Sequence, residues 1–212
     1  MCLLLDYIFC ALEEQGKMPN DAYAIKTIVT SEMATKICEV HNVKLYNVLT
    51  GFKFIAEVIG EHEAKKEGTF LLGYEESYGY MKGQYSRDKD GVVASMLICE
   101  MAAYYSLKGM TLIDAVESPS EKYGFYMENS AEIYMEGLDG KEKIAGLMDK
   151  LRAETPEKLA GSRVVNIRDY LAETSKNMLT GEVEGTGLPK PNVMYYKAEN
   201  GCVVVARPSG TE

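Results

Sequence analysis

Residues 69–80 read Thr-Phe-Leu-Leu-Gly-Tyr-Glu-Glu-Ser-Tyr-Gly-Tyr, an apolar run that changes abruptly into a loop with carboxylates and hydroxyls between glycines. The apolar run predicts a buried strand over Thr69–Gly73, followed by a loop through about Lys89. Two earlier runs, Ala24–Thr30 and Val43–Leu49, have the same β-rich composition. Helical patterns separate the three runs, and strands that alternate with helices indicate an α/β layer with a mostly parallel or mixed sheet.

Apolar spacing and capping residues define the helices expected around these strands. The expected helices cover Met1–Gln15, Ser31 to about Glu39, a long segment after Thr50, Asp90–Leu107, and Thr111 to about Lys122. The segment Asp90–Leu107 is apolar nearly all round, which is typical of a buried helix. Thr111 and Asp114 have the spacing of a capping box. The first half is therefore predicted to be a three-layer α/β domain.

The second half changes character and predicts a smaller α+β domain with an antiparallel sheet. An amphipathic helix is expected over Lys141–Arg152, and Asn200-Gly201 is a strong hairpin signal. The expected strands are Tyr126–Tyr134, Arg163–Ile167, Asn192–Lys197 and Gly201–Ala206, with a loop over Leu179–Pro191. The pattern is interrupted between Ser118 and Phe125, so we divide the chain into domains at 1–120 and 121–212.

The composition narrows the classes of function. The chain has 212 residues and a net charge of -9, which disfavours general binding to nucleic acids or anionic membranes. Two histidines leave little room for a histidine-rich metal site or a Ser-His-Asp triad. The five scattered cysteines lie mostly in apolar stretches and indicate buried thiols of a reducing cytosol. No apolar run reaches membrane-spanning length, and the start lacks a leader segment. A soluble, cytoplasmic protein is expected.

The loop after Gly73 is the first segment whose side chains could bind a ligand. The carboxyl end of a parallel strand is where α/β sheets place ligands. Glu75 and Ser77 offer a carboxylate and a hydroxyl that suit the vicinal hydroxyls of a sugar. The alternative interpretation, a polar surface loop, is equally compatible with these residues.

A second cluster, Arg207-Pro208-Ser209-Gly210-Thr211, also follows a predicted strand. A guanidinium, two hydroxyls and a glycine that admits backbone N–H groups are what the oxygens of a phosphate need. A simple turn at the end of a strand is the alternative. The combination favours an anion site made by Arg207, Ser209, Gly210 and Thr211.

Two further cations are weaker candidates for ligand binding. Lys53 stands near the start of a predicted helix, where a cation is unfavourable unless it meets an anion, although a solvated lysine is the commoner case. Arg87 lies in Arg-Asp-Lys-Asp-Gly, a charged stretch that leads into the apolar helix. The Asp-x-Asp-Gly in it lacks the later ligands of a calcium loop, so we interpret Asp90 as a helix cap.

These segments together resemble the α-D-phosphohexomutase superfamily. Gly-Tyr-Glu-Glu-Ser-Tyr-Gly resembles its sugar-binding loop, and Arg-Pro-Ser-Gly-Thr-Glu resembles its phosphate-binding loop. Thr50-Gly51-Phe52-Lys53 and Arg87-Asp88-Lys89-Asp90-Gly91 are similar to two further segments of its phosphoglucomutases. The four motifs occur in the family's order over almost the whole chain. The resemblance implies the third domain of these enzymes and most of the fourth, which has a TATA-binding-protein-like fold.

The resemblance also implies a mechanism and what this chain would contribute to it. A phosphoserine near Mg2+ gives its phosphoryl group to a sugar phosphate, and a bisphosphorylated intermediate forms and turns over. Mg2+ and a sugar 1,6-bisphosphate activator would be the cofactors of the full-length enzyme, and this chain alone would bind neither. Glu75 and Ser77 would bind the sugar; Arg207, Ser209, Gly210 and Thr211 would bind the phosphate that is not reacting. The family's phosphoserine and metal loops have no counterpart here, so no catalytic or metal residue is assigned, and the missing N-terminal domains of the enzyme are expected to supply both.

Several alternatives stay open at this stage. The parent protein is expected to be an intramolecular phosphotransferase, most similar to phosphoglucomutase, with phosphomannomutase or phosphopentomutase as alternative substrate classes. A non-catalytic module that binds sugar phosphates is the competing function, and it describes the behaviour expected of this chain by itself. A nucleic-acid-binding domain in the second half is disfavoured by the charge.

Overall fold

The computed structural model describes residues 1–136 and 139–208 and divides the chain into two compact units, Met1–Asn129 and Ser130–Glu212. Each unit is described by itself. Within the described residues, no helix combines the length and the apolar character that a membrane crossing requires.

The first unit alternates strands and helices, as predicted. Its helices are α1 (Cys2–Glu14), α2 (Met33–Val40), α3 (Phe52–Lys65), α4 (Gly91–Leu107), α5 (Leu112–Ala115) and α6 (Ser118–Tyr123). Its strands are β1 (Ala22–Thr27), β2 (Lys44–Val48), β3 (Thr69–Tyr74) and β4 (Tyr80–Met81). The strands have the order β2-β1-β3-β4. β1 runs parallel to both β2 and β3, and only the short β4 is antiparallel, so the sheet is mixed.

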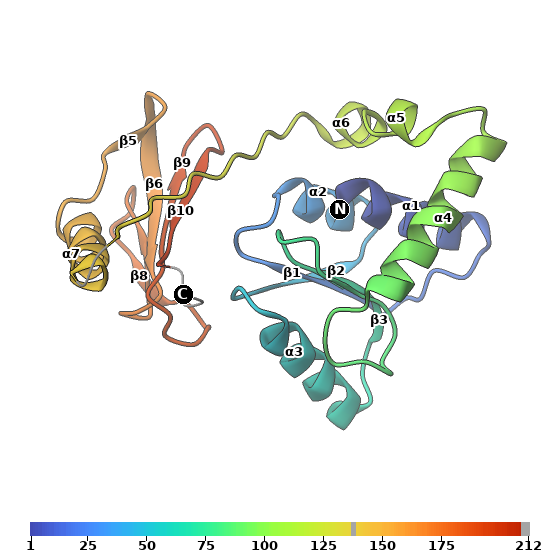
Figure 1. Cartoon of the computed structure of the whole chain (residues 1–212), viewed down its shortest axis with the longest axis horizontal. Helices are drawn as coiled ribbons and strands as arrows, with labels where there is room; N and C mark the ends of the chain where they lie inside the picture. The colour runs from blue at the N-terminus through green and yellow to red at the C-terminus, as the bar shows by residue number, and fades with distance from the viewer. Residues whose placement is uncertain (137–138, 209–212) are drawn as a thin grey trace. The chain divides into compact units, whose positions relative to one another are not determined.

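Helices cover both faces of this sheet, which gives the predicted three layers (Figure 1). Successive side chains of a strand point to opposite faces, and β1 shows this alternation directly. Ala22 and Ala24 pack with α1, α2 and α4, whereas Tyr23 and Ile25 pack against α3. All six residues of β1 are buried, so its sequence does not show the alternation of apolar and polar residues that a half-exposed strand has.

Two helix predictions need correction. α4 is not buried all round, because only Ala94, Leu97, Met101 and Tyr105 of this helix are buried. The single helix expected from Thr111 to Lys122 is two helices, α5 and α6. Pro119 lies in the first turn of α6, where its missing N–H and fixed φ are tolerated, so the sequence restarts a helix there instead of continuing one. The predicted capping box of Thr111 and Asp114 is confirmed at α5.

The second unit is an α+β unit with an antiparallel sheet, as predicted. It contains α7 (Gly140–Ala153) and the strands β5 (Lys158–Leu159), β6 (Ser162–Asp169), β7 (Thr174–Asn177), β8 (Val183–Gly185), β9 (Met194–Ala198) and β10 (Val203–Ala206). The sheet order is β10-β9-β6-β7-β8, and β5 pairs with β6. α7 covers one face, where Met148 packs with Val164, Ile167 and Met194. The predicted hairpin joins β9 to β10, with Gly201 at a φ of +85°.

The strand expected over Tyr126–Tyr134 is wrong. Residues 124–136 form no helix or strand, and Phe125 and Met127 are largely exposed. Alternating apolar residues make a strand only where a neighbour pairs with the backbone, and no described strand pairs with this segment. The first compact unit extends past α6 to Asn129, and Tyr126, which follows α6, packs against its core. The domain division at 120/121 stays a prediction.

Candidate functional site

The carboxyl ends of β1, β2 and β3 meet at one edge of the first sheet, because the three strands are parallel neighbours. Thr27 ends β1, Val48 ends β2, and Tyr74 ends β3. The loop with Glu75, Glu76 and Ser77 continues directly from β3. This edge is therefore the place where the fold gathers the polar residues predicted from the sequence.

Glu75 is the buried acidic group of this edge. Its residue surface is 4% exposed, and its Oε1 accepts a hydrogen bond from the Ser77 hydroxyl at 2.8 Å. The ammonium of Lys89 lies 3.6 Å from the same oxygen. A buried carboxylate is costly unless donors or cations compensate it, so Ser77 and Lys89 hold Glu75 in a defined orientation. The sequence motif indicated Glu75 and Ser77 but gave no reason to single out Lys89.

The backbone of the loop is compact. The N–H of Glu75 donates to the carbonyl of Gly79 at 3.1 Å, which closes the turn. Tyr78 has a φ of +63°, in the left-handed region that few non-glycine residues adopt. A Cβ on Gly79 would lie 2.5 Å from the Phe52 ring and 2.7 Å from Cδ of Lys89. A residue without a side chain is therefore required where the loop passes α3.

A polar network at the end of β1 contacts the loop that follows β3. The Thr27 hydroxyl donates to Oε2 of Glu76 at 2.7 Å and lies 2.7 Å from the Thr30 hydroxyl. Lys26, which is fully buried, donates to the Thr30 carbonyl at 3.0 Å and pairs with Glu32 at 3.1 Å. Burial lowers the pKa of Lys26, and the Glu32 carboxylate counteracts that effect. β1 thus positions the Glu76 side of the loop, which the sequence analysis missed because Lys26 and Thr27 lie in an apolar run.

The other two candidate cations, Lys53 and Arg87, contact residues other than Glu75. Lys53 is exposed at the start of α3, with its ammonium 4.8 Å from the centre of the Phe54 ring. Arg87 donates to the Gln84 carbonyl at 3.1 Å and forms an ion pair with Glu63. Glu63 is near the far end of α3, about 15 Å along the helix axis from Lys53. Substrate binding by Lys53 and Arg87 stays a prediction.

The phosphate-binding cluster is described only in part. Arg207 is exposed and directly follows β10, as predicted. Ser209, Gly210 and Thr211 lie outside the described residues. The second unit therefore presents the guanidinium at the end of a strand, and the role of the whole cluster in binding phosphate stays a prediction.

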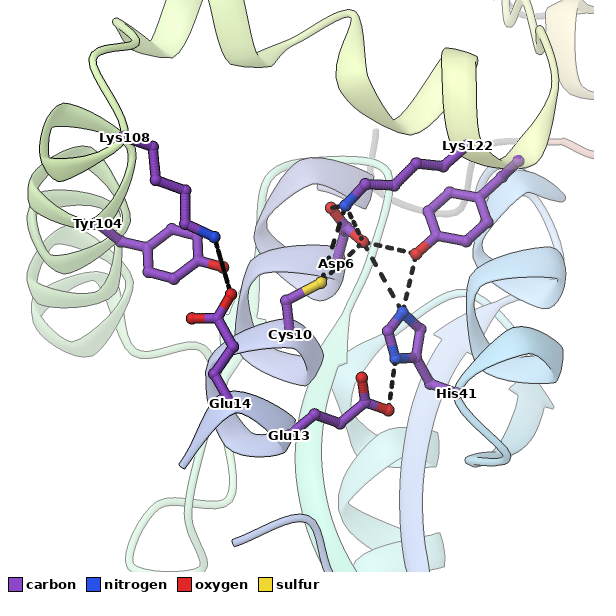
Figure 2. A network of polar contacts seen from close by, with 9 residues as sticks. Asp6, Cys10, Glu13, Glu14, His41, Tyr104, Lys108 and Lys122 are labelled. Carbon is purple, nitrogen blue, oxygen red and sulfur yellow. Dashed lines mark hydrogen bonds and ion pairs between the residues drawn. The ribbon is translucent and has the colours of Figure 1, made fainter. Parts of the chain in front are cut away.

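A second polar network, drawn in Figure 2, links α1 to the ends of α2 and α6. Asp6 is fully buried, and its Oδ1 accepts a hydrogen bond of 2.6 Å from the Tyr123 hydroxyl. That hydroxyl lies 2.8 Å from Nε2 of His41, and the Lys122 ammonium lies 3.0 Å from Oδ2 of Asp6. Burial together with Asp6 raises the pKa of the Cys10 thiol to about 11. The network therefore anchors α6 to α1.

The same residues are the one group of metal-ligand type in the part of the chain that the structure describes. Ligand atoms of Asp6, Cys10 and His41 lie within 4.8 Å of one another. A protonated thiol does not suit Mg2+, which prefers carboxylate and water oxygens. The Tyr123 hydroxyl and the Lys122 ammonium already occupy the space between the ligands. We interpret the group as structural.

Comparison with known proteins identifies a family whose members are similar to this chain. Residues 2–123 match the family model described as phosphoglucomutase/phosphomannomutase, alpha/beta/alpha domain III. A phosphoglucomutase of Staphylococcus saprophyticus is 36% identical over 190 residues, which cover 90% of this chain and 34% of that protein. A phosphoglucomutase of Staphylococcus haemolyticus is 34% identical over 210 residues, which cover 99% of this chain and 37% of that protein. The chain thus spans about a third of the length of these relatives.

Solved structures support the fold. A putative phosphomannomutase from Thermus thermophilus matches with a TM-score of 0.53 and 16% identity, covering 98% of this chain and 37% of that one. The open form of pp63/parafusin, a phosphoglucomutase from Paramecium, matches with a TM-score of 0.58 and 18% identity, covering 98% and 34%. At these identities the likeness concerns the fold alone.

Proposed function

The chain belongs to the phosphoglucomutase/phosphomannomutase family, and we propose that it supplies the sugar- and phosphate-binding loops of a phosphohexomutase that interconverts sugar 1-phosphates and 6-phosphates. The observation that carries this proposal is the carboxylate of Glu75, buried at the carboxyl end of β3 beside Ser77 and Lys89. In this role, residues 1–120 are the third domain of the enzyme and residues 121–212 are part of the fourth. Glucose phosphates are the first substrates to test, because the relatives are named phosphoglucomutase.

The residues of this chain bind and orient the sugar phosphate. The carboxylate of Glu75 accepts hydrogen bonds from vicinal hydroxyls, and charge-assisted bonds of this kind are about twice as strong as neutral ones. The Ser77 hydroxyl exchanges its bond to Glu75 for a bond to the sugar. Lys89 adds positive charge beside the bound sugar, where it favours developing negative charge on oxygen. A loop that recognises only hydroxyls can accept the substrate in either orientation, as a 1,6-phosphate exchange requires.

Arg207, with Ser209, Gly210 and Thr211, holds the phosphate that is not reacting. A guanidinium offers two parallel N–H groups to phosphate oxygens, so it fixes direction as well as charge. The phosphoryl group itself passes between a phosphoserine and the sugar hydroxyl, and both come from outside this chain. Mg2+, where bound, neutralises charge on the transferred group. The described residues do not suit it, so we place its ligands in the rest of the longer enzyme.

A binding module without turnover is the second candidate for the chain by itself. It is favoured by the share of the relatives that the chain spans, 34–37%. Assaying the 212-residue chain and the complete enzyme side by side with glucose 1-phosphate separates the two functions. We expect turnover only in the complete enzyme. Turnover by the purified chain above a mock preparation would show that the chain contains its own phosphoryl-transfer machinery.

A further inference from the structure

The outward face of α4 is mostly apolar, and the one charged side chain of this helix, the exposed Glu100, lies at the edge of that face. Residues four or seven apart share one helix face, and Val92, Met96, Cys99, Ala103 and Leu107 follow that spacing. All five are exposed within the first unit. Ser95 and Ser106, which are uncharged, flank the stripe. We call the five residues from Val92 to Leu107 with this spacing the α4 stripe; α4 itself is labelled in Figure 1.

The opposite face of α4 is buried in the core of the first unit. Ala94, Leu97, Met101 and Tyr105 are buried against the rest of the first unit. A surface helix of a soluble protein normally places charged residues opposite such a face. Here 26% of the chain is charged, yet α4 contributes only Glu100, at the edge of the α4 stripe. Val92 is 82% exposed and Leu107 is 91% exposed, so the stripe is an apolar surface of the kind that marks an interaction site.

We propose that the α4 stripe docks against an uncharged, apolar surface of a preceding domain of the same polypeptide. The matched family model is that of a third domain, and the chain spans only 34–37% of its relatives. A protein of the relatives' length has further domains, and an earlier one can cover an apolar face of a third domain. A neutral apolar stripe buries without the desolvation cost of charges. The inference rests on the proposed place in a longer enzyme, but not on the binding of sugar by Glu75.

Cys99 reports directly on this contact, because its side chain lies in the middle of the stripe and is exposed in the first unit. The experiment measures the rate at which N-ethylmaleimide alkylates Cys99, resolved by peptide mass spectrometry. Cys38, which is 1% exposed in the core, is the internal reference for a buried thiol. The rate is measured in the 212-residue chain at several concentrations and in the complete translation product of the coding sequence.

The proposal predicts fast alkylation in the 212-residue chain at every concentration. In the complete protein, alkylation should be slower by roughly tenfold or more, since it then requires a local opening. Equal rates in the two proteins overturn the proposal. So does protection that grows with the concentration of the 212-residue chain, which indicates a second copy, or protection at all concentrations, which indicates coverage by the second unit. A coding sequence that encodes only these residues contradicts it as well.

A pair of matched variants tests the surface without relying on the thiol rate alone. Met96 and Val40 are both helical and both 59% exposed, but only Met96 lies in the α4 stripe. In the complete protein, Met96→Glu should restore fast alkylation of Cys99, and Val40→Glu should leave it slow. Protection that survives Met96→Glu overturns the proposal. Neither measurement uses sugar binding or turnover, so a failure here is distinguishable from a failure of the proposed function.

Discussion

The ammonium of Lys89 lies 3.6 Å from Oε1 of Glu75, and the stem of the same lysine passes over Gly79 and the Phe52 ring. One side chain thus joins the sugar-loop carboxylate, the loop backbone and the start of α3. Lys89 is half exposed, whereas Glu75 is buried. The buried Glu75 carboxylate is therefore paired with the ammonium of Lys89, which is exposed enough for a ligand to contact it.

Removing polar atoms of the loop should lower kcat/KM, because hydrogen bonds to the sugar are lost. In the complete enzyme, Glu75→Gln removes the charge of the acceptor and Ser77→Ala removes the hydroxyl. A hydrogen bond that involves a charged group is worth about 1.5 to 3 kcal/mol, so kcat/KM should fall by about ten- to a hundredfold. Steady-state kinetics with glucose 1-phosphate measure the change. Ser86→Ala is the matched control, because Ser86 is exposed in the same loop and its hydroxyl donates to the Asp88 carbonyl. Equal kinetics in all three variants would mean that the loop is only a surface turn.

Adding a methyl group to the loop should cost stability. Gly79→Ala places a Cβ 2.5 Å from the Phe52 ring, so Phe52 or Lys89 must move, at a cost of about 1–3 kcal/mol. Gly60→Ala is the control, because nothing lies within 4 Å of a Cβ there and a helix interior gains up to about 1 kcal/mol from the change. Urea denaturation of both variants gives the difference. A Gly79→Ala chain as stable as the parent would contradict the close packing of the loop.

The strands and helices of the first unit could be predicted because their signals are local. The apolar residues of β1 and β3 and the Asp90 cap of α4 are signals that each act within a few residues. What could not be predicted depends on contacts between distant segments. Thr27 supports Glu76 across the sheet edge, and nothing in the apolar run of β1 indicates that hydrogen bond.

The errors have the same origin. α4 is apolar on two faces, and a pattern alone does not say which face the unit itself covers. Tyr126–Tyr134 alternates like a strand, but a strand also needs a partner, and pairing is a property of the whole fold.

The Asp6 network should contribute to stability through Tyr123. Tyr123→Phe leaves Oδ1 of the buried Asp6 without its 2.6 Å hydroxyl donor, which should lower the free energy of unfolding by about 1–3 kcal/mol. Tyr85→Phe removes a hydroxyl that donates to Asp90 at an exposed site and should change far less. Chemical denaturation of the two variants tests the contrast. Equal losses would argue against an anchoring role for the network.

The cap of α4 should make part of the stability depend on pH. The carboxylate of Asp90 accepts from the N–H groups of Val93 and Val92, and together with the Tyr85 hydroxyl they lower its pKa. Because the folded pKa lies below the unfolded value of about 3.9, the stabilisation is complete above that pH and is lost as the pH falls through the folded pKa.

Asp90→Ala should therefore lower the thermal midpoint at pH 7, and the difference from the parent should shrink as the pH falls below about 4. Asp90→Asn is the control, since it keeps a capping oxygen but does not titrate. Thermal melts from pH 2 to pH 7 follow both variants. A difference for Asp90→Ala that stays constant across this range would contradict the cap.

The central claim, that residues 75–79 bind the sugar and Arg207 binds the phosphate, is tested most directly by NMR titration of the 15N-labelled chain. Glucose 1-phosphate should shift the amides of 75–79 and those around Arg207, whereas inorganic phosphate should shift only the second group. Glu75→Gln should remove the first response, and Arg207→Ala the second, with Arg163→Ala as the exposed arginine control. The claim is contradicted if glucose 1-phosphate leaves residues 75–79 unmoved, or if inorganic phosphate shifts them equally.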